Sequence, residues 1–304
     1  MTLGVVAAVG QVLLLALVGL ALRLAGVLKP EDAKPLNDII IYVALPALVF
    51  RAIHAADVDV GLLRMAAVAW AVIIAGFALA WLLGSKVMRL AGPTAAGFML
   101  TAALGNTGYL GYPLALSLFG DAGLVRAIFY DIFGTVFAVL TLGIAIASRL
   151  GDTGGARPNP LRDIATFPGV IALAAGLLLH PVALPSLAGD VLDALSGLVV
   201  PLIMISLGVS LKPGHIKERW TSLSLVALIK LLALPLIAVV VGRLLLGDAE
   251  SQRLVVMQAG MPSMMLSLVF GLRYRLDVDF IASAILVTTV GAALTVPLFQ
   301  LLLG

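Results

Sequence analysis

Asn106 and Thr107 are the residues of this sequence whose types and position best suit the binding of a small polar ligand. They belong to the segment 105–113 (Gly-Asn-Thr-Gly-Tyr-Leu-Gly-Tyr-Pro), which interrupts an apolar stretch long enough to cross a membrane. Its glycines, proline, Asn and Thr disfavour a continuous helix, and a broken helix leaves unpaired N–H and carbonyl groups that favour anions and cations respectively. We therefore expect this segment to contact a substrate carboxylate or a coupling ion, through Asn106, Thr107, Gly108 and Pro113. The alternative is that Asn106 and Thr107 only cap the half-helix.

A second interruption lies at 260–263 (Gly-Met-Pro-Ser), about 155 residues after the first. Irregular backbone within a membrane is tolerated only where protein or a water-filled cavity satisfies its polar groups. Paired breaks in corresponding places of two halves point to the substrate site of a secondary transporter. We expect Pro262 and Ser263, with Gln258 one turn before, to contact the substrate from the second half. Pro262 could instead form a kink that touches no ligand.

Asp131 and Lys230 are charged residues that lie deep within apolar stretches. Asp131 is about eight residues into its stretch, and a carboxylate at that depth should face the interior and either pair or titrate. α-Helical spacing would put Thr135 on the same face as Asp131. We expect Asp131 to serve proton or sodium coupling or substrate gating, with a structural ion pair or a carboxylate that snorkels to the membrane surface as the alternatives. Lys230 could neutralise an anionic substrate or pair with Asp131.

The composition is that of an integral membrane protein. The 304 residues are 62% hydrophobic and 12% charged, against about 25% charged in soluble domains. Apolar runs of about 20 residues indicate helices rather than a barrel. The net charge of +3 comes from basic residues between apolar runs, which indicates membrane orientation, and no nucleic-acid partner is expected. With no cysteine and no histidine cluster, the sequence predicts no metal site and no cofactor.

Ten membrane spans fit the apolar runs. They lie near residues 3–25, 36–55, 62–88, 93–119, 123–148, 161–181, 187–211, 220–245, 251–272 and 279–303. A short linker, 151–160, separates the halves 1–150 and 161–304, which hold five spans each. An odd number of spans reverses the orientation of the second half, which is the condition for an inverted repeat. The predicted fold is an all-α membrane protein of ten transmembrane helices in two inverted five-helix repeats, with broken crossover helices 4 and 9.

Basic residues predict the orientation in the membrane. Thirteen Lys and Arg follow spans 1, 3, 5, 7 and 9, whereas five lie on the opposite side. The thirteen are Arg23, Lys29, Lys34, Lys86, Arg89, Arg149, Arg157, Arg162, Lys212, Lys217, Arg219, Arg273 and Arg275. The five are Arg51, Arg64, Arg126, Arg243 and Arg253. Because cytoplasmic connections carry the excess of positive charge, we expect the linker in the cytoplasm and both termini outside it.

The motifs resemble those of the auxin efflux carrier family of membrane transport proteins. Residues 106–114 (Asn-Thr-Gly-Tyr-Leu-Gly-Tyr-Pro-Leu) look like the family's Asn-Thr…Gly-x-Pro-Leu segment. Further similarity comes from Pro201-Leu202 with Leu207-Gly208 and from the run 260–274. The resemblance covers essentially the whole chain. The family includes the plant PIN auxin exporters and bacterial malonate and malate permeases.

The resemblance implies a scaffold and a mobile domain. Spans 1, 2, 6 and 7 would form the scaffold, often in a homodimer, and spans 3–5 and 8–10 would form the transport domain. The substrate would lie where spans 4 and 9 cross. Ser267 best matches a proline that plant members carry later in span 9, so it joins the predicted substrate contacts, and auxin specificity is not carried over. The short linker favours a prokaryotic carboxylate permease in a plasma membrane.

The sequence therefore predicts a secondary transporter of small organic anions, mono- or dicarboxylates, that works by elevator-type alternating access and is not an enzyme. An intramembrane aspartyl protease is disfavoured because no Gly-x-Gly-Asp motif accompanies Asp131. A passive anion channel stays open as an alternative. A sodium-coupled carrier similar to bile-acid symporters also stays open, although the second break offers few side-chain oxygens for sodium.

Overall fold

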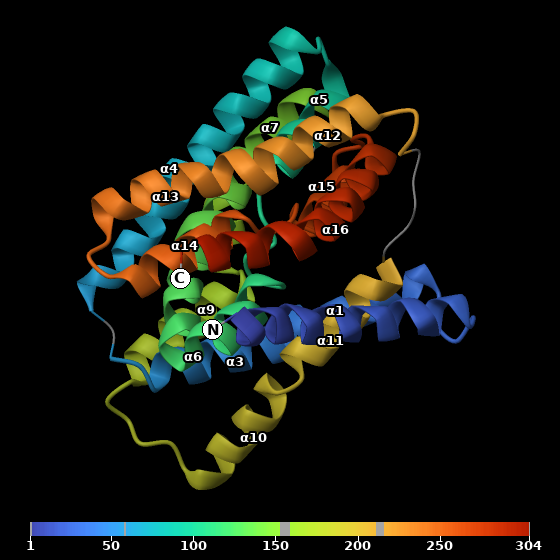
Figure 1. The fold of residues 1–304 in the computed structure, drawn as a ribbon. Coiled ribbons are helices and arrows are strands. Elements are labelled where there is room, and N and C mark those ends of the chain that lie inside the picture. The colour runs from blue at the N-terminus through green and yellow to red at the C-terminus, as the bar shows by residue number, and fades with distance from the viewer. Residues whose placement is uncertain (1, 58, 153–158, 211–215, 304) are drawn as a thin grey trace.

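The chain folds into helices that cross one another in several layers (Figure 1). The computed structural model describes residues 2–57, 59–152, 159–210 and 216–303, without the side chains of 2–9 and 11–13. Across these ranges there is no strand, and one isolated antiparallel bridge joins Gly105 to Ser263. The all-helical part of the predicted fold is thus confirmed.

The first half of the chain holds seven α-helices within the described ranges. They are α1 (Thr2–Leu24), α2 (Ala33–Ile39), α3 (Leu45–His54), α4 (Leu63–Ala80), α5 (Gly92–Ala103), α6 (Gly111–Phe129) and α7 (Ile144–Leu150). Short 3-10 or π-helical turns precede or continue them. These are η1 (Pro30–Asp32), η2 (Ile40–Ala44), η3 (Val60–Leu62), η4 (Trp81–Val87), η5 (Tyr130–Val136) and η6 (Val139–Gly143).

The second half of the chain holds nine α-helices and one π-helical turn within the described ranges. Its α-helices are α8 (Pro160–Ala165), α9 (Pro168–Leu179), α10 (Ser186–Ser196), α11 (Val199–Ser210), α12 (Trp220–Leu228), α13 (Leu234–Leu245), α14 (Ala249–Ala259), α15 (Leu266–Arg273) and α16 (Val278–Leu302). A π-helical turn, η7 (Ile229–Ala233), joins α12 to α13.

Six helical stretches in the described part of the chain are long and apolar enough to cross a membrane. They are Pro30–His54, Val60–Val87, Gly111–Leu150, Ser186–Ser210, Trp220–Leu245 and Val278–Leu302. The stretch Gly111–Leu150 bends at Gly120, whose φ of +65° is one that glycine adopts without strain. These stretches agree with a multi-pass membrane protein. The ten-span count and the inverted repeat stay predictions, and residues 153–158 of the predicted linker lie outside the described residues.

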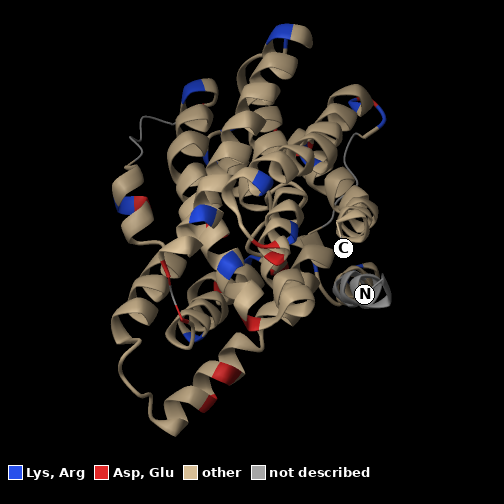
Figure 2. Cartoon of the chain, turned by 60° about the vertical axis from the view of Figure 1, so that its left-hand side comes forward, with Lys and Arg blue, Asp and Glu red and all other residues tan. Residues whose placement is uncertain are grey.

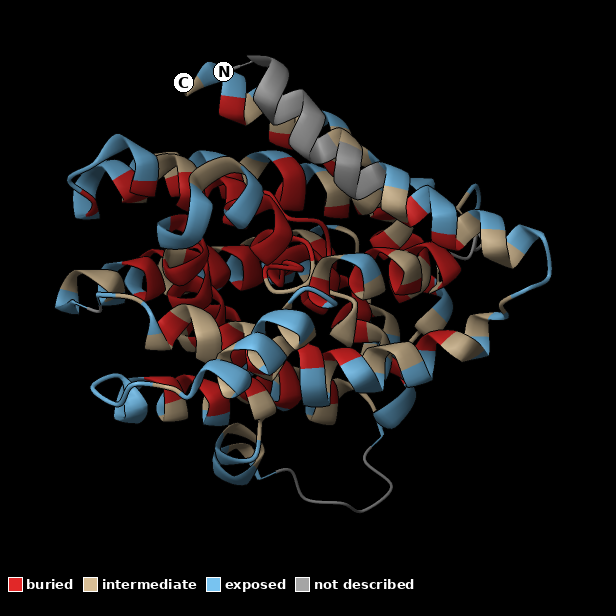
Figure 3. Cartoon of the chain, turned by 90° about the horizontal axis from the view of Figure 1, so that it is seen from below, coloured by how far each residue is buried: buried red, intermediate tan, exposed pale blue. Residues whose placement is uncertain are grey.

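The outer surface of the bundle is largely apolar. Most of the helical ribbon carries neither Lys, Arg, Asp nor Glu (Figure 2), and buried residues gather in its interior (Figure 3). Leu24, Leu178 and Leu294 are 77–78% exposed. A broad exposed apolar surface of this kind suits contact with lipid rather than water.

The helices pack in pairs around a buried centre. α1 lies along α11, and α3 lies along α9. On the other side of the bundle α4 packs against η5, and α13 packs against α14. Between these pairs lie the two places where helices stop inside the bundle, namely the gap between α5 and α6 and the gap between α14 and α15.

A polar cluster joins the ends of three helices outside this centre. One oxygen of Asp277 accepts a hydrogen bond of 3.1 Å from the backbone N–H of Phe280 and so caps α16. The other oxygen accepts a hydrogen bond of 2.8 Å from Thr94 in α5 and pairs with Arg219, which precedes α12. Partial burial raises the pKa of Asp277, but these hydrogen bonds outweigh it and hold that pKa below its usual value. Asp277 is therefore an anion at neutral pH that fixes α5, α12 and α16 to one another.

Candidate functional site

Two irregular segments meet where the helices stop. The first, 104–110, joins α5 to α6, and the second, 260–265, joins α14 to α15. The N–H of Asn106 donates to the carbonyl of Pro262 at 2.8 Å, and the N–H of Met264 donates to the carbonyl of Leu104 at 3.0 Å. These bonds flank the bridge between Gly105 and Ser263. The paired segments, as we call 104–110 and 260–265 together, thus satisfy part of each other's backbone.

Four helix ends surround the paired segments. The helices α5 and α14 end there, whereas α6 and α15 begin there. In the described part of the chain, the backbone N–H groups of Gly108, Tyr109, Met265 and Leu266 have no hydrogen-bond acceptor. Unpaired N–H groups at the start of a helix carry partial positive charge and attract anions. Both segments therefore contribute unpaired backbone donors that attract negative charge.

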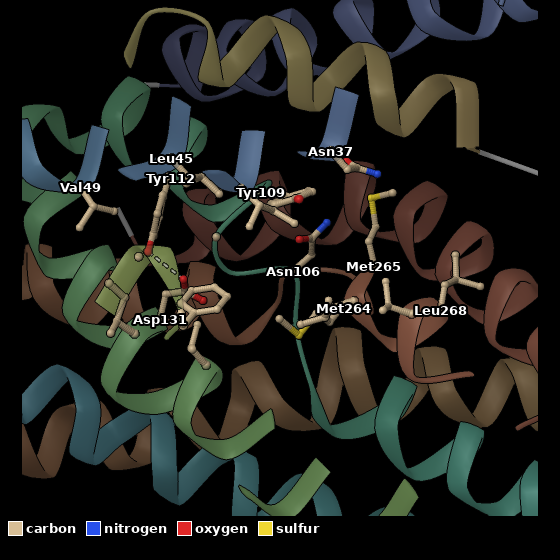
Figure 4. Close-up of a pocket in the computed structure, with 18 of the residues that line it drawn as sticks. Asn37, Leu45, Val49, Asn106, Tyr109, Tyr112, Asp131, Met264, Met265 and Leu268 are labelled. Atoms are coloured by element: carbon tan, nitrogen blue, oxygen red, sulfur yellow. Dashed lines mark hydrogen bonds between the residues drawn. The ribbon is translucent and has the colours of Figure 1, made fainter. Parts of the chain in front are cut away.

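A cavity of about 190 Å³ lies against the paired segments (Figure 4). Its polar side chains come from Asn37, Asn106, Tyr109, Tyr112, Asp131 and Ser210. Its apolar wall includes Ile41, Leu45, Val49, Ile132, Val136, Phe167, Met264, Met265, Leu266, Leu268 and Val269, and Gly108 and Gly169 complete the lining. A mostly apolar cavity with a few convergent polar groups is the usual form of a small-molecule site.

Asn106 presents a free amide to this cavity. Its side chain forms no hydrogen bond within the described residues, although the residue as a whole is only 4% exposed. Figure 4 shows it beside Tyr109, on the side of the cavity from which Asn37 projects. A buried amide without a protein partner costs free energy unless water or a ligand bonds to it. Asn106 is therefore well placed to bind a ligand.

Asp131 forms a second polar centre on the same cavity. Its two carboxylate oxygens accept hydrogen bonds from the hydroxyl groups of Thr107 at 2.5 Å and Tyr112 at 2.7 Å. Asp131 lies in the π-helical turn η5, and the next residues of that turn on the cavity are Ile132 and Val136. Thr135, which α-helical spacing put on the face of Asp131, does not line the cavity, and its hydroxyl is buried without a partner among the described residues.

Lys230 lies on the other side of the paired segments, in η7. Its side chain is buried, and its ammonium donates to the carbonyl of Ala259 at 3.0 Å. Within the described residues it forms no ion pair with Asp131 or with any other carboxylate. Lys230 does not line the cavity. The two buried charges are thus held separately, one by hydroxyl groups and one by a helix C-terminus.

Gln258, near the end of α14, links that helix to the first segment and to α6. Its side-chain nitrogen donates to the carbonyls of Thr107 at 3.3 Å and Ala127 at 3.5 Å, while its oxygen is buried with no partner among the described residues. A Cβ atom on Gly111 would lie 2.0 Å from that oxygen. Gly111 is therefore required for the first turn of α6 to pack against Gln258.

The structure divides the predicted substrate contacts, together with the predicted coupling residue Asp131, into two groups. Asn106, Gly108 and Asp131 line the cavity. Thr107, Pro113, Gln258, Ser263 and Ser267 do not line it, and Pro262 lines a separate apolar cavity together with Leu110 and Met261. Ser263 instead donates to the carbonyl of Thr101 at 2.7 Å, and the hydroxyl of Ser267 is buried without a partner. The predicted set thus surrounds the cavity, but less than half of it faces the cavity directly.

Several residues that line the cavity could not be predicted from the sequence. Tyr109 and Tyr112 lie within the polar motif but look like ordinary aromatic packing. Asn37, Phe167 and Ser210 come from elements that are distant along the chain, so only the fold brings them here. Met264 and Met265 form part of the cavity wall.

The chain resembles known proteins over nearly its full length. Its residues 4–160 and 159–300 match the profile of a family described as membrane transport protein. It is similar to an uncharacterized transporter of Methanocaldococcus jannaschii, with 36% identity over 296 residues that cover 95% of each chain. It is also similar to an uncharacterized transporter of Methanothermobacter thermautotrophicus, with 34% identity over 298 residues and 96% of each chain. Both descriptions indicate transport rather than enzymatic catalysis.

Proposed function

Because this chain belongs to the membrane transport protein family, the auxin efflux carrier family that its motifs resemble, we propose that it carries small organic anions across a membrane. The substrates would be mono- or dicarboxylates. The observation that carries this proposal is the cavity against the paired segments. It is lined by Asn106 with its free amide and by residues of both segments whose backbone N–H groups have no acceptor among the described residues. Those donors are what a carboxylate needs, and the apolar wall suits the remainder of an organic acid.

The bound anion would sit between the helix starts. One carboxylate oxygen would accept from the amide nitrogen of Asn106, and the N–H groups near the start of α6 and α15 would face the same negative charge. Tyr109, Met264 and Leu45 would enclose the carbon skeleton. The role of Pro262 and Ser263 would be to shape the second segment rather than to touch the anion. Thr107 would act through Asp131.

The position of the cavity supports alternating access of the elevator type. Asn37, Leu45 and Phe167 belong to the predicted scaffold spans, whereas Asn106 and Met264 belong to the predicted transport spans. A substrate bound at such a boundary would be exposed to one side or the other as the transport domain slides past the scaffold. In this proposal the protein has ten spans in two inverted repeats.

The proposed orientation in the membrane rests on the positions of the two termini and on the distribution of basic residues. The start of α1 and the end of α16 lie close together in Figure 1, which supports an even number of crossings. Together with the distribution of basic residues, this favours both termini outside the cytoplasm. We place the protein in a plasma membrane, as a homodimer formed through the predicted scaffold.

Asp131 is our candidate for coupling transport to a proton or sodium gradient. It is buried, it lines the cavity, and its partners in the described structure are hydroxyl groups rather than a cation. A negative charge here would repel an anionic substrate, so binding of a cation or a proton to Asp131 would favour substrate binding. In this account the Asp131→Asn variant would still exchange substrate but would lose accumulation driven by a pH gradient. Asp38→Asn, which changes an exposed carboxylate, is the matched control.

The proposal can be tested with purified protein. Thermal unfolding is measured with a panel of mono- and dicarboxylates, each with and without sodium and at two pH values. The best carboxylate is then tested for counterflow in proteoliposomes, where saturation and counterflow identify a carrier and their absence identifies a channel. A rise in melting temperature with one acid class, followed by counterflow, is the expected result. No stabilisation by any carboxylate and no counterflow would contradict the proposal.

A further inference from the structure

Lys230 is a buried cation whose surroundings are backbone carbonyls. It is only 2% exposed. Its ammonium donates to the carbonyl of Ala259, the last residue of α14, at 3.0 Å. No carboxylate pairs with it within the described residues. A buried ammonium is costly without compensation, so the source of negative potential around Lys230 has to be found.

Two helix C-termini provide that potential. The helices α5 and α14 both end at the paired segments, and each C-terminus carries roughly half a negative elementary charge. The carbonyls of Ala102 and Ala103 at the end of α5 accept no hydrogen bond in the described structure. A Cβ atom on Gly105, two residues after α5, would lie only 2.9 Å from the Lys230 nitrogen. One ammonium group therefore lies next to both ends, and its single positive charge balances their sum.

We propose that Lys230 is the positioning residue of the paired segments: its ammonium is a built-in counter-charge for the C-terminal ends of α5 and α14. With those ends balanced, the positive N-terminal ends of α6 and α15 are left to act on the cavity. Without this ammonium, the two C-termini and the Asp131 carboxylate would make the surroundings of a bound anion net negative. The consequence for anion binding rests on the proposed function, whereas the consequence for the folded state does not.

Gly105 provides the space that the Lys230 ammonium group needs beside the two helix ends. A Cβ atom at this position would lie 2.9 Å from the ammonium nitrogen, which is too close, so the ammonium group would have to shift. Gly105→Ala therefore displaces the charge while the lysine is still present. In the Lys230→Ala background the same substitution meets no ammonium. The two changes should couple in a double-mutant cycle, with Gly105→Ala costing less stability when Lys230 is absent.

The first test is the melting temperature of the full chain in detergent without any ligand. Lys230→Met keeps the length of the side chain and removes its charge. We expect a decrease of about 2–6 °C, with a decrease also for Gly105→Ala. Lys34→Met, at an exposed lysine, is the matched control and should leave the melting temperature nearly unchanged. If Lys230→Met melts at or above the wild-type temperature, the charge is not needed and the proposal is overturned.

The second test separates charge from packing. Lys230→Ala leaves a space that propylammonium fits, because this ion replaces the missing part of the lysine side chain. We expect propylammonium to restore part of the lost melting temperature and propanol at the same concentration to restore less. Equal effects of the two additives would show that filling the space is enough. No effect from either would show that a positive charge in this space does not restore stability. Either result would overturn the counter-charge.

The third test concerns the anion. Malonate is used as the probe, and its binding to Lys230→Met is compared with the wild type by calorimetry. We expect at least a tenfold loss of affinity that propylammonium partly reverses in Lys230→Ala. If malonate binding is unchanged while the first two tests hold, the link to anion binding is wrong and the structural role stands. If the wild type binds neither malonate nor any other carboxylate, the proposed function fails while the stability tests still decide on Lys230.

Discussion

The two paired segments each donate a backbone hydrogen bond to the other, but they differ in the side chains that they bring to the cavity. Segment 104–110 brings Asn106, Gly108 and Tyr109 to the cavity, and α6 adds Tyr112 as a partner for Asp131. Segment 260–265 brings only Met264 and Met265 to it, and its serine bonds to the backbone of α5. In our proposal the first segment would therefore supply recognition, while the second would supply backbone dipoles, an apolar wall and stability.

The strongest test of this difference is a change in the first segment that removes recognition without removing structure. Asn106→Ala keeps the backbone bond from residue 106 to Pro262 and deletes an amide that has no protein partner. We expect carboxylate affinity to fall about 10- to 100-fold, measured by calorimetry, with little change in melting temperature. Asn159→Ala, which removes an exposed helix-capping amide that does not line the cavity, should leave the affinity unchanged. Wild-type affinity in a well-folded Asn106→Ala protein would place recognition elsewhere.

Packing between the segments is tested at Gly111. A methyl group at this position would collide with the buried oxygen of Gln258, so Gly111→Ala should destabilise the protein by about 3 kcal/mol. The matched control is Gly189→Ala in α10, where a Cβ atom would meet nothing within 4 Å. The control should be neutral or slightly stabilising, because Ala favours helix. Equal unfolding free energies for the two variants would show that Gln258 can move freely and does not hold the segments together.

The second segment should respond in the opposite way to the first. Ser263→Ala removes the donor to the buried carbonyl of Thr101 and should lower the free energy of unfolding by about 1–2 kcal/mol. Carboxylate affinity should change by less than that of Asn106→Ala, since Ser263 does not line the cavity. The contrast between the two segments would disappear if Ser263→Ala lost affinity as strongly as Asn106→Ala while keeping its melting temperature.

The smallest effect is expected outside the paired segments, at Asp277. The folded-state pKa of this carboxylate is below its usual value, so its contribution to stability is complete above the unfolded-state pKa of about 3.9. That contribution is lost as the pH falls through the lower folded-state value. Asp277→Asn should therefore lower the melting temperature at pH 7, and the difference from wild type should shrink below about pH 4. A difference that grows on acidification would contradict this sign.

The sequence revealed those parts of the site that break a local rule. Asn106 and the two glycine-rich breaks are conspicuous because polar and flexible residues are rare inside apolar helices. Asp131 and Lys230 are conspicuous because charge is costly at that depth. The all-helical fold and the family were predicted from the same patterns, and both are confirmed.

What the sequence did not reveal depends on backbone geometry and on distant contacts. The partner of Lys230 is a main-chain carbonyl, which has no residue type to mark it. Asp131 lies in a π-turn, and nothing in the local composition predicts such a turn. Asn37 and Phe167 reach the cavity only through the packing of α2 and α9 near the paired segments. The proposed ten-span repeat stays a prediction because its symmetry has yet to be tested.

The central claim is that the anion binds in the cavity against the paired segments, and substrate protection of single cysteines tests it most directly. The chain has no cysteine of its own, so Met265→Cys on this cavity and Ser196→Cys on a separate polar cavity each introduce a single thiol. The rate of thiol modification is measured in proteoliposomes with and without the carboxylate that stabilises the protein most. Our account predicts that the carboxylate slows modification of Met265→Cys, in proportion to its occupancy, and leaves Ser196→Cys unchanged. Protection of Ser196→Cys with no protection of Met265→Cys would contradict the account.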